Sequence, residues 1–311
     1  MLVSGEMKMD NALVALSNEL AAAVERARRS VVTVHARPRL ASSGVHWRQG
    51  VIVTAEHTVK HDEEITIGMP DGSSVAATLA GRDPGTDIAV LKADNLLNPV
   101  VDFSDTPVQT GNLILAVGRA PDSGVNATMG VISAVSGSWC TWRGGMLDQY
   151  IRLDVTLYPG SSGGVVINTQ GEALGIATSG LSRLAGLAVP ASTVNRVVDE
   201  LLAKGHISRG YLGLGLQPIA LPADLSKKLK LPNSAGVIVL SVEPDGPADR
   251  AGLMIGDILV SLNGKPVKDT DDVQSVLEPG FVGKPVAAAL VRGGALAEAS
   301  ITIGERPRRA E

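Results

Sequence analysis

The clearest candidate for chemistry is a serine set among glycines, in the run Gly-Ser-Ser-Gly-Gly at residues 160–164. Glycine adopts a positive φ without steric penalty, so such a turn can expose the Ser162 hydroxyl and aim backbone N–H groups at one point. Donors of this kind, expected from Gly160 and Ser162, stabilise the oxyanion of an acyl-transfer intermediate. The alternative interpretation is an ordinary Gly/Ser hairpin turn.

A histidine and an aspartate stand before this turn, each beside an apolar run. His57 follows the run at residues 51–55, and Asp87 leads into the run at residues 88–91. A carboxylate shielded from water can orient an imidazole, which in turn can take the proton of a serine hydroxyl. Singly, a surface histidine or a turn-capping aspartate explains each residue. Together with Ser162, in the order His, Asp, Ser, they favour nucleophilic catalysis.

The same pentapeptide also fits the Gly-x-Ser-x-Gly nucleophile elbow of α/β-hydrolases. That elbow requires a helix after the serine and a histidine later in the chain. Residues 165–169 are instead typical of a strand, and the sole later histidine is His206, at the end of a predicted helix. These two points argue against an esterase.

The elements that must position these residues are short strands separated by turn signals, a pattern typical of an all-β barrel pair or sandwich. An amphipathic helix is expected before them, over residues 10–29 with Asp10 as its cap. A second helix is expected after Pro190, with Ser192 as N-cap and Gly205 as its end. The predicted strands cover residues 31–36, 50–54, 65–69, 88–92, 113–117, 128–135, 151–155, 165–168 and 173–178.

Residues 209–304 are expected to form a separate unit. Strands are predicted near residues 236–242, 258–262 and 285–291, with a short helix at 247–251 and a longer one at 270–277. The length of 311 residues agrees with two domains.

Composition excludes several classes of protein. The net charge is −4, and no block of basic residues occurs before the terminal Arg306-Pro307-Arg308-Arg309, which argues against nucleic acid as the main partner. The single Cys140 excludes an intrachain disulfide and a cysteine-based zinc cage. His57 and His61 lack a third ligand, so no metal is expected. His35 is expected at the surface of a strand, and His46 in a loop.

The length of the apolar runs and the character of the first residues bear on where the protein is located. No run approaches the roughly 18 residues of a transmembrane segment, and the first residues do not resemble a secretory signal. We therefore expect a cytoplasmic protein, with a periplasmic or exported one as the alternative if a further segment precedes this sequence.

Three segments, residues 51–60, 86–92 and 158–166, resemble the catalytic segments of the HtrA (Deg) family of trypsin-like serine proteases. Residues 209–215 and 236–264 resemble its PDZ domain. The resemblance implies a mainly β protein, with a trypsin-like double β-barrel, an α+β PDZ domain and an N-terminal helix. It implies His57 as general base, Asp87 as its orienting partner and Ser162 as nucleophile, with Gly160 and Ser162 supplying the oxyanion hole and no metal or organic cofactor.

The expected domain bounds are an N-terminal helical segment (1–29), the protease domain (30–190), a linker helix (191–208), the PDZ domain (209–304) and a tail (305–311). The expected function is hydrolysis of peptide bonds in unfolded or damaged proteins through an acyl-enzyme. The alternative is an inactive, PDZ-bearing peptide-binding or chaperone-like protein. The resemblance also suggests a homotrimer.

The PDZ domain is expected to bind extended peptides, chiefly free C-termini, through a loop formed by four residues. The loop backbone would face the terminal carboxylate, and its leucines would line an apolar pocket. The four residues are Tyr211, Leu212, Gly213 and Leu214.

The sequence departs from the family pattern in three places. Ser161 and Glu56 each stand where the family has Asn, and residues 41–49 leave no room for a long loop, which disfavours cage-like assemblies. Because Ser161 cannot pair with a new N-terminus, we expect no proteolytic activation. The uncharged residues 156–159 and 176–179 predict a preference for aliphatic side chains at the cleaved position.

Overall fold

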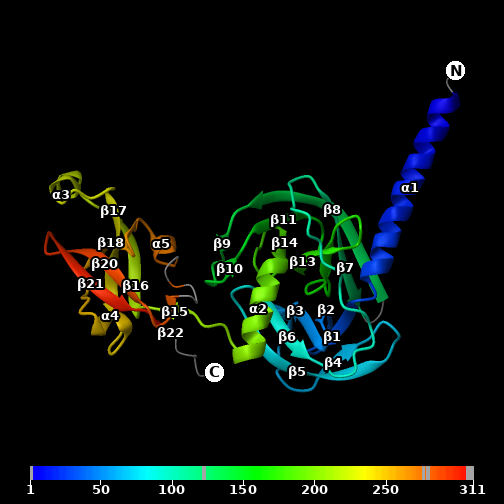
Figure 1. Ribbon diagram of the computed structural model, residues 1–311, viewed down its shortest axis with the longest axis horizontal. Helices are drawn as coiled ribbons and strands as arrows, with labels where there is room; N and C mark the ends of the chain where they lie inside the picture. Colours follow the sequence, from blue (N-terminus) through cyan, green and yellow to red (C-terminus); the bar gives the residue numbers. More distant parts are fainter. Residues whose placement is uncertain (1–2, 121–123, 275–276, 278–280, 306–311) are drawn as a thin grey trace. The chain divides into compact units, whose positions relative to one another are not determined.

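The computed structural model describes residues 3–120, 124–274, 277 and 281–305 (Figure 1). The chain divides into two compact units, Met1–Ile207 and Ser208–Glu311. Among the helices of the described residues, none is long and apolar enough to span a membrane.

The first barrel of the N-terminal unit is a closed ring of six antiparallel strands in the order β1-β2-β3-β6-β5-β4. Its interior is filled by aliphatic side chains such as Val32, Ile52 and Leu91, which alternate with residues that face outward. A 3₁₀ helix, η1 (Glu56–Thr58), follows the third strand. The strands are β1 (Val31–His35), β2 (Ser42–Arg48), β3 (Val51–Ala55), β4 (Ile65–Gly68), β5 (Ser74–Asp83) and β6 (Ile88–Lys92).

The second barrel is also closed and antiparallel, in the order β11-β14-β13-β12-β7-β8. A short hairpin, β9 (Trp139–Cys140) and β10 (Met146–Leu147), lies between β8 and β11 in the chain. Two closed barrels confirm the predicted trypsin-like fold class. The strands are β7 (Leu113–Ala120), β8 (Gly124–Ser136), β11 (Tyr150–Asp154), β12 (Val165–Ile167), β13 (Ala173–Thr178) and β14 (Gly186–Pro190).

The sequence patterns did not predict β2, β5 or β14, although each is needed to close a barrel. Strand β2 begins Ser-Ser-Gly, yet six of its seven residues are buried. Its hydroxyls find hydrogen-bond partners across the barrels, so burial there does not depend on apolar side chains. Local hydrophobicity therefore gave no signal for this strand.

Helix α1 (Val3–Ala27) is longer than expected, and the prediction that Asp10 caps it is wrong. Residues 3–9 contain no proline, so the helix continues through them and Asp10 lies within it. Its C-terminal part packs on the core through Ala23 and Ala27. Its earlier turns extend away from the barrels (Figure 1), leaving Leu13 64% exposed and Leu16 45% exposed.

Helix α2 (Ala191–Lys204) packs against the barrels through Val194, Val197 and Leu201. The N-cap is Pro190, without a side-chain cap bond, so the prediction of Ser192 is wrong by two residues. Strand β14 ends at this proline, whose fixed φ suits the entry into a helix. The predicted end is confirmed, since Gly205 is the C-cap with φ 76°.

The second unit contains a sheet with the order β16-β17-β18-β20-β21, in which β16 is an edge strand. The predicted helix 270–277 is described only over α5 (Thr270–Gln274), which lies beside β16; Ser275 and Val276 fall outside the described residues. Residues 306–311 of the predicted tail also fall outside them. The elements are β15 (Gly210–Tyr211), β16 (Leu214–Ala220), α3 (Ala223–Lys228), β17 (Ala235–Val242), α4 (Pro247–Arg250), β18 (Ile258–Leu262), β19 (Lys265–Pro266), α5, β20 (Pro285–Arg292), β21 (Ala295–Thr302) and β22 (Gly304–Glu305).

Candidate active site

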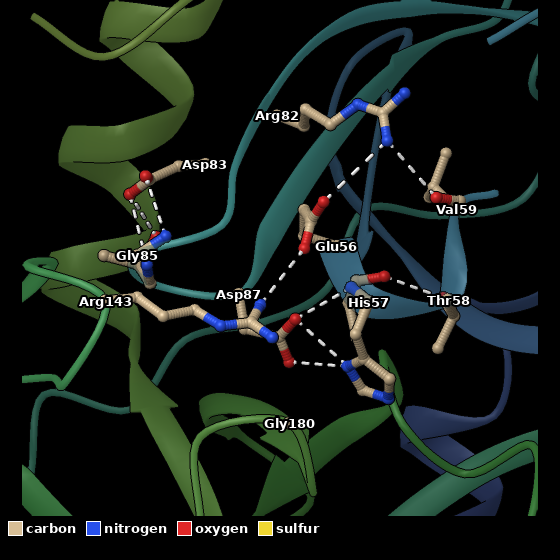
Figure 2. A network of polar contacts seen from close by, with 12 residues as sticks. Glu56, His57, Thr58, Val59, Arg82, Asp83, Gly85, Asp87, Arg143 and Gly180 are labelled. Atoms are coloured by element: carbon tan, nitrogen blue, oxygen red, sulfur yellow. Dashed lines mark hydrogen bonds and ion pairs between the residues drawn. The ribbon is translucent and has the colours of Figure 1, made fainter. Parts of the chain in front are cut away.

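His57 and Asp87 are joined by the first barrel. Strand β3 is buried along its whole length and leads directly into η1, which carries His57. The imidazole Nδ1 lies 2.8 Å from Oδ2 and 3.0 Å from Oδ1 of Asp87, whose Oδ1 also accepts the His57 backbone N–H at 2.8 Å. The Asp87 side chain is fully buried, whereas that of His57 is 25% exposed. Figure 2 shows the carboxylate facing both nitrogens. A carboxylate on Nδ1 leaves Nε2 available as a base.

The backbone turn that delivers Asp87 is held by another aspartate, Asp83. Its carboxylate accepts the N–H of Gly85 at 3.0 Å and both the N–H (3.2 Å) and the hydroxyl (2.8 Å) of Thr86. Asp87 itself has a φ of 58°, a left-handed conformation that a non-glycine residue adopts only when its surroundings require it. Sequence reasoning missed Asp83; its spacing from Gly85 is the typical signal of an Asx turn.

Residues 178–180, at the end of β13, touch all three predicted catalytic residues. The Thr178 hydroxyl donates to Oδ2 of Asp87, and the Ser179 hydroxyl lies 3.1 Å from the Ser162 Oγ. A Cβ on Gly180 would come within 2.6 Å of both His57 Nδ1 and Asp87 Oδ2. Glycine is therefore required there by close packing. Sequence reasoning did not select these residues for catalysis, because the contacts join strands of two different barrels.

Ser162 lies in the turn between β11 and β12, close to the other two residues through this segment. Its side chain is buried, and the described hydrogen bond of its hydroxyl is the one with Ser179. No hydrogen bond between Ser162 and His57 occurs among the described residues. The segment 178–180 thus links the three side chains, and the predicted nucleophile is hydrogen-bonded to Ser179.

Within the turn around Ser162, some backbone N–H groups donate hydrogen bonds and others meet no acceptor among the described residues. Those of Ser161, Gly163 and Gly164 donate to the carbonyls of residues 158, 177 and 161. The N–H groups of Gly160 and Ser162 meet no acceptor in the described part of the chain. Gly160 has a φ of 93°, as expected for a glycine that shapes the turn. The two open donors are the two predicted for an oxyanion hole.

The predicted peptide loop of the second unit spans the junction of β15 and β16. Leu212 is buried and Gly213 has a φ of 75°, while Leu214 begins the edge strand β16. The carbonyls of Leu212 and Gly213 accept the N–H groups of Ala248 and Glu243 at 2.9 and 2.8 Å. Their own N–H groups meet no acceptor among the described residues, so they are open to an anion.

Two family models match the chain. Residues 42–176 match the trypsin-like peptidase domain, and residues 210–303 match the PDZ domain. The structure is similar to that of the serine endoprotease from Yersinia pestis, with 31% identity and a TM-score of 0.74, over 93% of this chain and 98% of that one. It is also similar to the HtrA-type protease AlgW with a decapeptide, with 28% identity and a TM-score of 0.76, over 93% and 99%.

This protein belongs to the HtrA family.

Curated relatives include two proteins that are each named "Probable periplasmic serine endoprotease DegP-like". The one from Brucella suis biovar 1 (strain 1330) is 33% identical over 287 residues, covering 88% of this chain and 54% of the relative. The one from Rhizobium meliloti (strain 1021) is 34% identical over 288 residues, covering 88% and 55%. The chain thus spans about half the length of these relatives. Their names give no support to the expected cytoplasmic location.

Glu56, a departure from the HtrA pattern, places a second carboxylate behind the His57–Asp87 pair. Its side chain is 13% exposed and lies 3.8 Å from Arg82 and 3.7 Å from Arg143 (Figure 2). Burial, followed by repulsion from Asp87, raises the pKa of Glu56 above its ordinary value, while the two guanidinium groups oppose this. Arg143 belongs to the β9–β10 connection, so the cluster ties that hairpin to the histidine segment.

The predictions for two other histidines, His35 and His46, have different outcomes. His35 is exposed at the end of β1, as predicted. The prediction that His46 lies in a loop is wrong, because it lies within β2 and is 1% exposed. Its Nδ1 bonds the Asn98 carbonyl at 2.8 Å, which offsets part of the cost of burying the ring, while Nε2 has no hydrogen-bond partner among the described residues.

Proposed function

We propose that this chain is a serine endopeptidase that hydrolyses peptide bonds in unfolded or damaged proteins. The observation that carries the proposal is the turn around Ser162, where the N–H groups of Gly160 and Ser162 remain open beside the hydroxyl. The His57–Asp87 pair at the same place supplies the base. Membership of the HtrA family supports the same reaction class.

The proposed reaction begins when the Ser162 hydroxyl leaves Ser179 and turns toward Nε2 of His57. Nε2 takes the hydroxyl proton as Oγ attacks the scissile carbonyl carbon, and Asp87 stabilises the resulting imidazolium. The negative oxygen is stabilised by the N–H groups of Gly160 and Ser162. The imidazolium then protonates the leaving amine. Water, deprotonated by His57, hydrolyses the acyl-enzyme and restores the Ser162 hydroxyl. These steps use no metal or organic cofactor.

A fluorophosphonate label tests this proposal, because it reacts with an activated serine. We expect wild-type protein to be labelled at Ser162 and to degrade unfolded casein, with the variant Ser162→Ala doing neither. Short-chain esters should be poorer substrates than casein. Folded wild-type protein that stays unlabelled would overturn the enzyme proposal.

The alternative is a peptide-binding or chaperone-like protein without catalysis. The hydrogen bond between Ser162 and Ser179, in place of one to His57, is the observation that favours it. In that case the protein would bind unfolded casein, remain unlabelled and suppress aggregation equally well with Ser162→Ala.

For the primary specificity pocket we propose a preference for aliphatic side chains such as Val, Ala or Leu. Residues 176–178 of β13 are buried and uncharged, and Asp154 at the end of β11 is exposed. A pocket for Lys or Arg requires a buried acid. Cleavage of a peptide library mainly after Lys and Arg would contradict this preference.

Full activity without N-terminal trimming is expected, because Ser161 carries no charge and cannot pair with a new N-terminus.

The second unit, residues 209–304, is proposed to bind peptides by adding a strand to β16. An edge strand beside helix α5 and the open N–H groups of Leu212 and Gly213 support this. Tyr211 and Leu214 flank them. One structure of the HtrA-type protease AlgW contains a decapeptide, which supports peptide binding by this chain.

We propose a periplasmic location, supported by the names of the curated relatives. Fractionation of the native host, with the protein detected by antibody, tests it; recovery with cytoplasmic markers would contradict it. The bounds 30–190, 191–208 and 209–304 are retained as the proposed protease domain, linker helix and PDZ domain.

A further inference from the structure

A buried serine of strand β2, Ser43, lies directly against the nucleophile turn. Its side chain is inaccessible to solvent, and its Oγ is 2.8 Å from the carbonyl oxygen of Gly160. The same Oγ lies 2.9 Å from the backbone nitrogen of Arg119 in β7. The hydroxyl therefore joins the first barrel, the second barrel and the turn that carries the predicted oxyanion donors.

The direction of these bonds follows from chemistry. The backbone N–H of Arg119 is a donor only, so it occupies a lone pair of the Ser43 hydroxyl. The single hydroxyl proton is then free to be donated. The Gly160 carbonyl at 2.8 Å is a closer acceptor than the Arg119 carbonyl at 3.4 Å. Ser43 thus donates to Gly160.

This bond fixes a peptide group that the oxyanion hole depends on. The peptide between Gly160 and Ser161 is held at both ends, by Ser43 on its carbonyl and by the Tyr158 carbonyl on its N–H, at 2.9 Å. The backbone N–H of Ser43 also donates to the Ser162 carbonyl at 3.2 Å. These bonds hold the backbone between the N–H groups of Gly160 and Ser162, which themselves meet no acceptor among the described residues.

A close approach of β7 keeps this contact short. A Cβ on Gly118 would lie 2.7 Å from the Ser43 Oγ and 3.2 Å from the Ser161 Cα. The side chain of Arg119 anchors the same strand, donating to the Val31 carbonyl at 2.8 Å and to that of Arg28 at 3.2 Å. The hydroxyl of Ser43 is held in position from three sides.

We infer that Ser43 is a positioning residue for the oxyanion hole: its hydroxyl holds the Gly160 carbonyl so that the N–H groups of Gly160 and Ser162 point at the reacting carbonyl. The inference rests on the proposed protease function. It assigns Ser43 no contact with substrate, so substrate binding does not depend on this residue.

The chain offers a matched control in the neighbouring residue, Ser42. It is also a fully buried serine of β2, but its hydroxyl accepts a bond from Thr58 at 3.0 Å and makes no hydrogen bond to the turn among the described residues. Ser43→Ala should lower kcat by about 10- to 100-fold with little change in KM, somewhat less than loss of an oxyanion donor itself. Ser42→Ala should keep kcat within about threefold of the wild type.

Inhibition by a peptide boronic acid distinguishes a positioning role from a purely structural one, because a purely structural role would leave this inhibition unchanged. The tetrahedral adduct of the boronic acid with the serine uses the oxyanion hole, whereas a product-like peptide does not. Ser43→Ala should weaken boronate inhibition by the same factor as kcat, and leave inhibition by the product-like peptide unchanged. Melting temperatures identify a folding defect. If Ser43→Ala does not fold, Ser43→Cys fills the γ position with a slightly larger sulfur and keeps a weak donor, and should give an intermediate loss of kcat and of boronate affinity.

The outcomes separate this inference from the proposed function. A wild-type protein that neither cleaves casein nor binds the boronate overturns the function. An active wild type in which folded Ser43→Ala, or Ser43→Cys in its place, matches Ser42→Ala in kcat and boronate affinity overturns the positioning role alone. A rise in KM without loss of kcat would also overturn it.

Discussion

At the scale of single residues, Glu56 is a largely buried carboxyl group beside the predicted catalytic pair. Burial and the nearby Asp87 raise its pKa above the ordinary value of 4.5, so the fold favours the protonated form. A carboxyl group whose pKa is raised by folding stabilises the protein most at pH values below its ordinary pKa. This contribution is lost as the pH rises through the pKa of the group in the folded protein.

We therefore expect Glu56→Gln to gain stability relative to the wild type as the pH rises from 5 to 8. The gain should be of the order of 1 kcal/mol at most, because Arg82 and Arg143 compensate part of the cost of the charge. Urea unfolding at several pH values measures it. Glu63→Gln, at an exposed position, serves as control. The prediction would be contradicted if the wild type became more stable relative to Glu56→Gln as the pH rises.

At the scale of elements, the end of β13 links predicted catalytic residues that come from the two barrels. Residues 178–180 contact Asp87, His57 and Ser162, and only glycine fits at position 180, where a Cβ would lie 2.6 Å from two of them. Since the clash is with the predicted catalytic groups, a methyl group there should damage catalysis more than folding.

Gly180→Ala should lower kcat/KM by about 100-fold or more, since a misplacement of about 1 Å costs that much. The control is Gly137→Ala, whose added Cβ meets no atom within 4 Å. Kinetics on a peptide substrate, with melting temperatures for both variants, measure the difference. Equal activity of the two variants would show that the contact is not needed.

At the scale of the whole molecule, helix α1 presents apolar side chains that this chain does not cover. Leu13, Val14 and Leu16 are 64%, 57% and 45% exposed. Exposed apolar patches mark association surfaces. We propose that they form part of a homotrimer contact.

Light scattering should give a mass near three times 32.1 kDa for the wild type and a smaller mass for Leu13→Glu combined with Leu16→Glu. The charged side chains would have to be buried in the interface, which is unfavourable. Arg29→Glu, just beyond the helix, controls for added charge. A wild-type mass of 32 kDa at working concentration would rule out the trimer.

A further prediction concerns the binding of peptide C-termini by the second unit. Peptides with a hydrophobic free C-terminus should bind more tightly than their amidated forms, by about tenfold or more, because the open N–H groups of Leu212 and Gly213 favour a carboxylate. Isothermal titration measures the ratio. Equal affinities would reject the carboxylate loop. Coupling to the protease requires in addition that the free acid changes turnover.

Much of the architecture was predictable from local patterns. Runs of β-branched residues between turn signals indicated most barrel strands, and Gly205 indicated the end of α2. The spacing of His57, Asp87 and Ser162, with Gly160 in the turn, indicated the candidate site. The strand and helix signals lie within a few residues of one another, so local backbone preferences are sufficient to read them. The three candidate residues lie far apart in the chain, and their order His, Asp, Ser and the resemblance to the HtrA family indicated them.

Other features depend on contacts between distant segments. Strand β2 begins with polar residues, and their buried hydroxyls meet partners in η1, in β7 and in the turn at Gly160. The prediction for His46 is wrong for a related reason, because its partner Asn98 lies 52 positions away. Thr178, Ser179 and Gly180 acquire their roles only when the second barrel closes against the first, and Ser43 touches Gly160 across 117 positions of the chain. A hydrogen bond or a steric limit of this kind is a property of two surfaces brought together. The residue types determined which chemistry was available here, and tertiary packing decided which groups hold the reacting atoms in place.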